Sequence, residues 1–222
     1  MNSSLFLELE EAVNAVEPRV WEDYNPGLSD AQIDAIMKNV SFDLPDDLRA
    51  LYRWKNGSDQ GASFLGPVIQ MLPLAEEQAL TAESKTPFVA EDWSHYIREE
   101  IREFYDIPDE PLPFDIDTKE LVCLFDDGGD GTYIIGVFAP QGSTCCEIWQ
   151  FYPADAPSLS CMFRGVEAMI NTALEWWRLG LFASRPHNYE PGWCLDQNFP
   201  KALEIGKRLN PDCNYWLDGA TQ

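Results

Sequence analysis

Hydrophobic residues recur at every third or fourth position in several stretches of the chain, which is the spacing of one buried face on an amphipathic helix. The first stretch begins at Leu5 and predicts a helix that stops before Glu17-Pro18, because proline cannot continue a helix. Residues 21–27 then predict a loop. The same spacing predicts further helices over residues 29–40, 45–56, 92–106, 164–180 and 200–209.

Start and stop signals support two of these helices. Ser29 and Gln32 have the three-residue spacing of a capping box, in which each side chain satisfies the other residue's backbone N–H. Pro45 fits the first turn of the next helix, where its missing N–H costs nothing. Asn56-Gly57 predicts a left-handed end to that helix.

Runs of β-branched and aromatic residues predict strands in the middle of the chain. Leu121–Phe125 and Thr132–Phe138 are two such runs, joined by the Asp- and Gly-rich residues 126–131. Cys145–Tyr152 is a third run, so the three predict an antiparallel meander. Residues 64–74 predict one short strand with irregular flanks.

The pattern changes after the helix of 164–180. Residues 184–198 predict an extended linker with aromatic anchors, followed by a short helix over 200–209 and a turn. The sequence therefore predicts an α+β protein in which a mainly antiparallel sheet is flanked by helices. We expect one domain over residues 1–183 and a C-terminal extension over 184–222.

The composition favours a folded, cytoplasmic protein. Of the 222 residues, 45% are hydrophobic and 13% aromatic, which excludes intrinsic disorder. No apolar run approaches the roughly 20 residues that a membrane-spanning helix needs. The N-terminus lacks the basic and apolar regions of a secretory signal.

The charge is strongly negative and unevenly distributed. The formal net charge is −23, and residues 91–131 carry 14 acidic and 3 basic residues, a net charge of −11. Residues 160–222 have a net charge of only −1. This charge excludes nucleic acid and an anionic membrane as direct partners, since both are polyanions. It suits a basic protein partner, and it also suits simple solubility.

The cysteines predict reduced thiols and neither a disulfide scaffold nor a zinc site. The chain has 6 cysteines and 2 histidines, and no two cysteines have C-x-x-C spacing. A disulfide scaffold is not expected at this size without a secretory signal. We expect no metal and no cofactor.

The loop of residues 126–131 is the densest cluster of potential cation ligands. Asp126 and Asp130 fit positions 1 and 5 of an EF-hand loop, but position 3 is Gly128, and position 12, where a bidentate Glu is required, is Val137. A calcium EF-hand is therefore excluded. A polar turn is the favoured interpretation, with a loosely held cation or a partner contact as alternatives.

No catalytic motif of a known class is present, so we expect a protein without enzymatic activity. His95 falls within the predicted helix of 92–106, where an exposed structural histidine is favoured over a catalytic base. Trp176 lies at the margin of the apolar face of its helix. It is interpreted either as an interface anchor or, with preference, as a residue buried against the C-terminal extension.

The N-terminal third resembles a known superfamily. Its residues Gly27-Leu28-Ser29, then Phe42-x-Leu44-Pro45-x-x-Leu48-x-x-Leu51-Tyr52 and Asn56-Gly57, are similar to the N-terminal signature of the SUKH superfamily, which contains yeast cell-wall-assembly regulators and their bacterial relatives. The resemblance extends in pattern over residues 4–181. It implies an α+β fold and a non-catalytic, protein-binding role, which in bacterial members is typically immunity to a nuclease or deaminase toxin. It implies a folding role for Leu44, Pro45, Tyr52, Asn56 and Gly57.

Charge and resemblance together predict an acidic surface that binds a basic toxin domain. The alternative is a regulatory or adaptor protein in cell-wall or stress signalling, for which the C-terminal extension would be a docking element. The residues expected to bind the toxin are Asp106, Asp109, Glu110, Asp115, Asp117, Asp126, Asp127 and Asp130.

Overall fold

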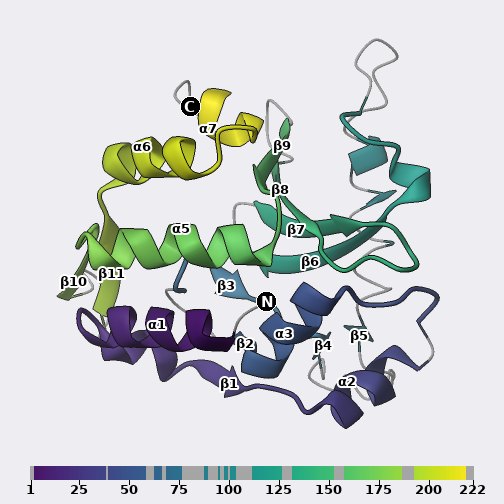
Figure 1. The fold of residues 1–222 in the computed structure, drawn as a ribbon, viewed down its shortest axis with the longest axis horizontal. Coiled ribbons are helices and arrows are strands. Elements are labelled where there is room, and N and C mark those ends of the chain that lie inside the picture. Colours follow the sequence, from purple (N-terminus) through teal and green to yellow (C-terminus); the bar gives the residue numbers. More distant parts are fainter. Residues whose placement is uncertain are drawn as a thin grey trace.

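Helices and a five-stranded antiparallel sheet make up the fold in this computed structural model (Figure 1). The structure describes residues 3–38, 40–58, 63–66, 69–76, 88–89, 95, 98–99, 101–103, 112–126, 132–152, 158–186 and 193–218. The architecture confirms the predicted α+β class with a mainly antiparallel sheet.

The helices lie mostly at the two ends of the chain, with the sheet between them in sequence. The α-helices are α1 (Ser3–Asn14), α2 (Asp30–Met37), α3 (Asp46–Trp54), α5 (Val166–Arg178), α6 (Phe199–Leu209) and α7 (Asn214–Asp218). Two short 3-10 helices are η1 (Pro18–Trp21) and η2 (Ile116–Thr118). Residues 95, 98–99 and 101–103 are also helical, inside the helix predicted over 92–106.

The main sheet has the strand order β3-β6-β7-β8-β9, and every neighbouring pair is antiparallel. Its strands are β3 (Gln70–Met71), β6 (Glu120–Asp126), β7 (Tyr133–Phe138), β8 (Glu147–Tyr152) and β9 (Ser158–Phe163). Three two-stranded pairs accompany it: β1 (Tyr24–Pro26) with β2 (Lys55–Ser58), β4 (Ala75–Glu76) with β5 (Phe88–Val89), and β10 (Phe182–Pro186) with β11 (Trp193–Gln197).

The centre of the main sheet is covered on both faces. Every residue from Leu121 to Phe125 is buried, and alternate residues of a strand point to opposite faces. On one face a methyl group added at Gly136 would contact Leu48 of α3. On the other face, the ring of Trp149 packs edge-on against Phe114, with ring centres 5.1 Å apart. This double coverage explains why β6 and β7 read as continuous apolar runs.

Three helices lie side by side, with α5 between α1 and α6 (Figure 1). Helix α5 also packs on β8 and β9, so it links the helical layer to the sheet. The indole N–H of Trp177 in α5 donates to the carbonyl of Phe64, 2.8 Å away. No helix within the described part of the chain is long and apolar enough to cross a membrane.

The local signals at the second helix are confirmed, whereas one signal at the third is wrong. The Ser29 and Gln32 capping box forms as predicted. Pro45 stands at the N-cap of α3, one residue before the first turn. Helix α3 ends at Trp54 and passes directly into β2, so Asn56-Gly57 does not end it. Gly57 does adopt a positive φ of 82°, but within the strand.

Several short elements of the described chain were not predicted. Residues 21–27 contain the end of η1 and strand β1 instead of a loop alone. Strand β9 lies immediately before α5, over residues for which no element was predicted. The linker predicted over 184–198 is wrong, because β10 and β11 pair there as an antiparallel hairpin. Helix α7 follows the predicted turn.

The C-terminal extension shares the hydrophobic core of the rest of the chain. Trp216 of α7 is only 3% exposed, and its indole N–H donates to the carbonyl of Met162 in β9, 2.5 Å away. Ala202 of α6 accepts a 3.1 Å hydrogen bond from the indole of Trp176. These contacts attach α6 and α7 to both α5 and the sheet.

Candidate protein-binding surface

The residues of the N-terminal third that carry the family resemblance are buried or make contacts within the fold. Leu44 and Tyr52 are buried, and Pro45 begins α3. The side-chain carbonyl of Asn56 accepts a 3.0 Å hydrogen bond from the backbone N–H of Leu74. A Cβ added at Gly57 would lie 2.6 Å from the backbone nitrogen of Pro73, a distance that real contacts do not reach. These environments agree with the folding role that the resemblance implies.

The candidate acidic surface begins at η2. Asp115 is exposed and caps η2 by accepting a 3.2 Å hydrogen bond from the backbone N–H of Asp117. The side chain of Asp117 is 69% exposed and forms an ion pair with Arg102. Two of the predicted partner-binding carboxylates therefore lie together at η2, a few residues before β6 begins at Glu120.

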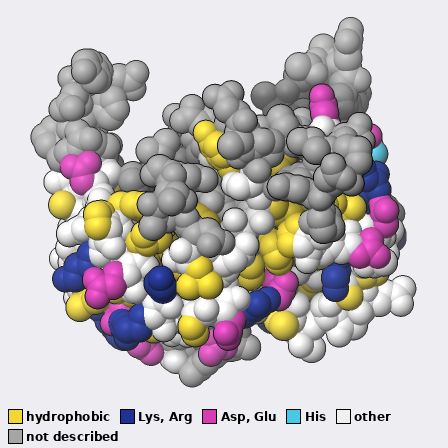
Figure 2. Space-filling view, turned by 90° about the horizontal axis from the view of Figure 1, so that it is seen from above, with side chains coloured by type: hydrophobic (Ala, Val, Ile, Leu, Met, Phe, Trp, Pro, Cys, Tyr) yellow, Lys and Arg dark blue, Asp and Glu magenta, His cyan; other side chains and the backbone are white. Residues whose placement is uncertain are grey.

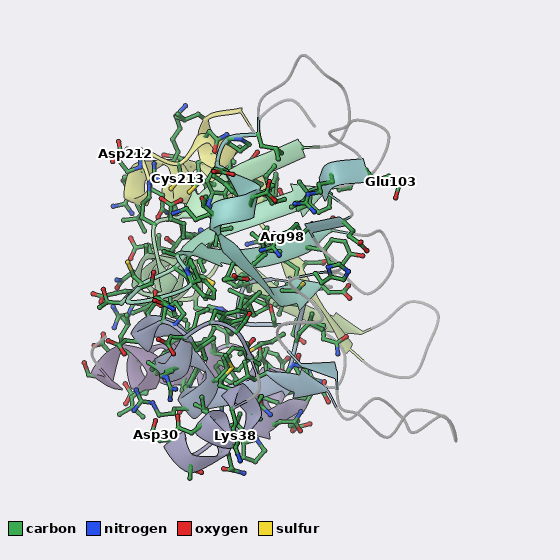
Figure 3. The ribbon with its side chains drawn as sticks, turned by 90° about the vertical axis from the view of Figure 1, so that its right-hand side faces the viewer. Asp30, Lys38, Arg98, Glu103, Asp212 and Cys213 are labelled. Carbon is green, nitrogen blue, oxygen red and sulfur yellow. The ribbon has the colours of Figure 1, made fainter. Side chains whose placement is uncertain are left out.

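Two of the three basic side chains of this region, those of Arg98 and Arg102, are bound to its own acidic and carbonyl groups. A guanidinium nitrogen of Arg98 donates to the carbonyl of Lys119 at 2.6 Å and lies 3.4 Å from the carboxylate of Glu120. Both Arg98 and Glu120 side chains are only 20% exposed. Arg98 points inward, while the exposed Glu103 lies at the edge of the molecule (Figure 3). The exposed charge at this edge is therefore mainly negative.

Asp126 lies apart from the carboxylates of η2. It is the last residue of β6, paired with Tyr133 in β7 and Gln70 in β3. Asp126 is six residue steps along the strand from Glu120, which corresponds to about 20 Å. The structure thus brings Asp115 and Asp117 together and places Asp126 at the other end of the strand.

The remaining predicted partner-binding residues lie outside the described part of the chain, so their arrangement stays a prediction. They are Asp106, Asp109, Glu110, Asp127 and Asp130. Residues 127–131 of the loop also lie outside the described residues. The alternatives of a cation site or a partner contact in this loop therefore stay predictions. Within the described ranges, no three His, Cys, Asp or Glu side chains lie close enough to hold a metal ion.

Comparison with known families decides the classification. The sequence model of the SMI1 / KNR4 family (SUKH-1) matches residues 27–161, which is more than half of the chain. The chain belongs to this family. The match covers the signature helices, the acidic segment and strands β6 to β8, and it ends inside β9. A search of curated proteins found no match.

Membership of SUKH-1 gives the coarse functional class. The family includes immunity proteins, and its domains are generally non-enzymatic immunity or regulatory modules. The C-terminal hairpin, α6 and α7 lie beyond the matched residues. This SUKH-1 chain therefore carries a C-terminal segment that the family match does not include.

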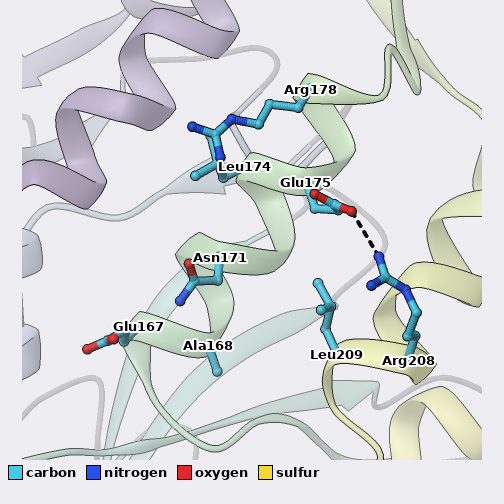
Figure 4. A pocket seen from close by; sticks show the side chains of 8 residues that line it. All are labelled: Glu167, Ala168, Asn171, Leu174, Glu175, Arg178, Arg208 and Leu209. Atoms are coloured by element: carbon cyan, nitrogen blue, oxygen red, sulfur yellow. Dashed lines mark hydrogen bonds and ion pairs between the residues drawn. The ribbon is translucent and has the colours of Figure 1, made fainter.

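A groove between α5 and α6 is a second surface feature of this SUKH-1 domain, and sequence reasoning missed it (Figure 4). Two ion pairs involve its lining residues. Glu175 of α5 pairs with Arg208 of α6 at 2.9 Å, and Arg178 of α5 pairs with Glu8 of α1 at 2.7 Å. Leu209 on its rim is 39% exposed. It is lined by Glu167, Ala168, Asn171, Leu174, Glu175, Arg178, Arg208 and Leu209.

Mixed charge distinguishes the C-terminal side of the molecule from the acidic surface. Arg208 and Arg178 balance the groove's two carboxylates, Glu167 and Glu175. Figure 2 shows the face seen from above, on which described basic, acidic and hydrophobic side chains are interspersed over the whole width of the molecule. The groove has no pronounced charge of either sign, so charge gives no reason to assign it a basic or an acidic partner.

The structure shows where the two candidate residues Trp176 and His95 lie. Trp176 is 4% exposed and packs edge-on against Phe182 and Trp216, so its burial against the C-terminal extension is confirmed. His95 has an exposed side chain 3.4 Å from the carboxylate of Glu99. This agrees with an exposed helical residue.

Cys123, Cys145, Cys146, Cys161 and Cys213 are free thiols. Cys123 and Cys146 are buried in the core, and burial raises the pKa of both thiols well above the usual range. A thiol that is held protonated is a poor nucleophile. These two cysteines therefore act as small hydrophobic residues of the sheet.

Proposed function

We propose that this SUKH-1 domain is a cytoplasmic immunity protein that binds a basic toxin domain through the acidic surface formed by residues 91–131. The observation that carries the proposal is the net charge of −11 in this segment, within a family that includes immunity proteins. The exposed carboxylates at η2 supply the described part of that surface.

Electrostatics gives this surface a physical role. A toxin that cleaves or deaminates nucleic acid needs a basic cleft for the phosphate backbone. An acidic protein can occupy such a cleft by presenting carboxylates where phosphates would lie. Complementary charge also speeds association, by factors on the order of 10 to 1,000. The same charge repels nucleic acid and anionic membranes, so binding is directed to a protein.

Of the three basic residues of the segment, Arg98 is largely withdrawn from the surface, whereas the half-exposed Arg102 offsets part of the charge of Asp117. Arg98 is largely buried against Lys119 and Glu120, so it contributes a fixed internal contact. Arg102 is paired with Asp117. Asp115 and Glu103 are exposed beside them. A basic partner therefore meets mainly carboxylates at this edge.

The test is protection from a toxin whose gene lies beside that of this chain. The basic C-terminal domain of a large secreted protein encoded there would be expressed in bacteria with and without this SUKH-1 domain. Restored growth and a stable one-to-one complex are expected. Unimpeded killing with no complex would reject the immunity role and favour a regulatory or adaptor role in cell-wall or stress signalling.

The adaptor role made a separate prediction about the C-terminal extension. It required residues 184–222 to be available as a docking element. Cys213 and Trp216 are buried against the sheet, whereas Phe199, Leu209 and Leu217 of the same extension are exposed. Loss of binding after deletion of this extension would therefore have to be separated from loss of folding, by measuring the thermal stability of the shortened chain.

A further inference from the structure

Two cysteines of the C-terminal half meet in space although 52 residues separate them. The thiol of Cys161 in β9 donates to the sulfur of Cys213, which directly precedes α7, and the two sulfurs are 3.6 Å apart. Their residues are 3% and 0% exposed. Because they belong to the sheet and to the C-terminal extension, a bond between them would join these two parts covalently.

The backbone around the pair is held by independent contacts. The backbone N–H of Cys161 donates to the side-chain carbonyl of Asn214 at 2.8 Å. Arg164 donates to the carbonyl of Asp212 at 2.9 Å, immediately before Cys213. The sulfurs of a disulfide are about 2 Å apart, so closure requires a movement of roughly 1.6 Å, which side-chain rotation can supply.

We propose that Cys161 and Cys213 are a reversible disulfide site that fastens α7 to β9 when a low-molecular-weight disulfide such as oxidised glutathione is present. The reaction has two thiol–disulfide exchange steps. The thiolate of Cys213 attacks one sulfur of oxidised glutathione and releases one glutathione thiolate. The thiolate of Cys161 then attacks the sulfur of Cys213 and releases the second. Two electrons pass to glutathione, and the two cysteine protons end on the two glutathione thiols.

Cys213 is assigned the first attack because of its surroundings. Burial raises the pKa of both thiols, and the positive charge of Arg164 acts against the rise at both. The hydrogen bond between the two thiols separates them, because it lowers the pKa of Cys213, the acceptor, and raises that of Cys161, the donor. The thiolate is thus less unfavourable at Cys213. Since both sulfurs are buried, the oxidant must enter through opening of α7, a helix of five residues. Oxidation should therefore be slow and controlled by that opening.

The experiment uses the full chain, incubated for a day with either reduced or oxidised glutathione and then alkylated, digested and weighed by mass spectrometry. Oxidised glutathione should yield the Cys161 and Cys213 peptides joined, lighter by two hydrogen atoms than the two thiol peptides. The oxidised chain should melt about 5–10 °C higher, because a disulfide across a long loop restricts the unfolded state. Reduction should reverse both changes.

Two matched variants sharpen the test. Cys213→Ser should lose the joined peptide and the melting response, whereas Cys145→Ser, which removes an exposed thiol, should keep both. Trp216→Phe removes the hydrogen bond that holds α7 to Met162 and should speed the cross-link several-fold. The proposal is overturned if Cys161 and Cys213 of the unmodified sequence both remain alkylatable, or if oxidation stops at adducts of Cys145. Because this outcome is read from the unmodified chain, it does not depend on whether any variant folds.

Discussion

A carboxylate oxygen of Asp47 lies 3.3 Å from the backbone nitrogen of Val166 and accepts its hydrogen bond, which connects the N-terminal ends of α3 and α5 across 119 residues of sequence. The same oxygen accepts a 3.1 Å hydrogen bond from the backbone N–H of Cys146. The other oxygen accepts from Leu48 at 2.8 Å. One buried side chain therefore joins the starts of two helices to the residue that directly precedes β8. Helix N-termini favour a negative group, which suits this carboxylate.

Replacement of Asp47 should destabilise the fold. Asp47→Ala leaves buried backbone N–H groups without acceptors, which costs about 1–3 kcal/mol. Urea unfolding should show this loss, while Asp46→Ala, an exposed neighbour in the same helical turn, should change stability by less than about 1 kcal/mol. Equal stability of the two variants would contradict the structural role of Asp47.

A second buried carboxylate, that of Glu17, should make the free energy of unfolding depend on pH in the acidic range. Glu17 is buried beside Arg19, whose guanidinium donates two hydrogen bonds to it and lowers the pKa of Glu17 to about 2, against an ordinary value of 4.5. A lowered pKa in the folded state means that this contribution is present above pH 4.5 and is lost as the pH falls towards 2. Since Arg19 is 44% exposed to water, the contribution is small, about 1 kcal/mol.

Glu17→Gln tests this dependence. At pH 7 the variant should unfold at a lower urea concentration than the unmodified chain. The difference between them should shrink as the pH falls from 4.5 to 2, because protonation of Glu17 removes the same charge. A stability difference that stays constant over this range would show that the carboxylate charge does not matter.

Gly57 and Gly142 form a matched pair of substitutions. Both have a positive φ, of 82° and 69° respectively, so alanine is strained at each by about 1 kcal/mol. A Cβ at Gly57 would also lie 2.6 Å from the backbone nitrogen of Pro73, whereas nothing lies within 4 Å at Gly142. Gly57→Ala should therefore cost about 3 kcal/mol in urea unfolding, well above Gly142→Ala. Similar costs would mean that β2 and Pro73 do not approach so closely.

The packing of α6 on α7 depends on another small residue. A Cβ at Gly206 would lie 2.4 Å from the ring of Trp216, whose indole is fixed by its hydrogen bond to Met162. Alanine normally gains about 1 kcal/mol over glycine inside a helix. Here we expect a net loss of about 1–3 kcal/mol, because the ring must be displaced. Circular dichroism melting should show it, with Lys207→Ala as the exposed control on the same helix.

The helices and central strands could be predicted because each has a complete local signal. The capping box of Ser29 and Gln32 needs only four consecutive residues, and the apolar runs of β6 and β7 reflect burial on both faces. Strand β9 was missed although Leu159 and Cys161 alternate with polar neighbours, because the helical period of α5 begins three residues after the strand ends.

The missing elements depend on partners that are distant in sequence. Strands β10 and β11 pair with each other across six intervening residues, and prolines within this stretch resemble linker composition. Asn56-Gly57 has the composition of a helix end, but pairing of β2 with β1 extends the chain there. The groove of α5 and α6 and the Cys161–Cys213 contact likewise arise only from tertiary packing.

The acidic surface could be predicted in part for the same reason. Clustering along the sequence placed Asp115 and Asp117 together, since they are two residues apart at η2. It could not show that Asp126 lies at the opposite end of β6, because an extended strand carries neighbours in sequence far apart in space. Binding by these residues stays a prediction.

The most direct test of the central proposal is the salt dependence of binding to a basic toxin domain, sought among the products of neighbouring genes. Its dissociation constant would be measured at about 0.05 M and about 0.5 M salt, where charges are screened weakly and strongly. The comparison is between the unmodified chain, Asp115→Lys/Asp117→Lys, and Glu204→Lys/Asp212→Lys, which changes the net charge equally on the C-terminal side. We predict at least about tenfold weaker binding at low salt for the first variant, little change for the second, and a smaller difference at high salt. Equal affinities of the two variants at low salt would contradict the proposed surface.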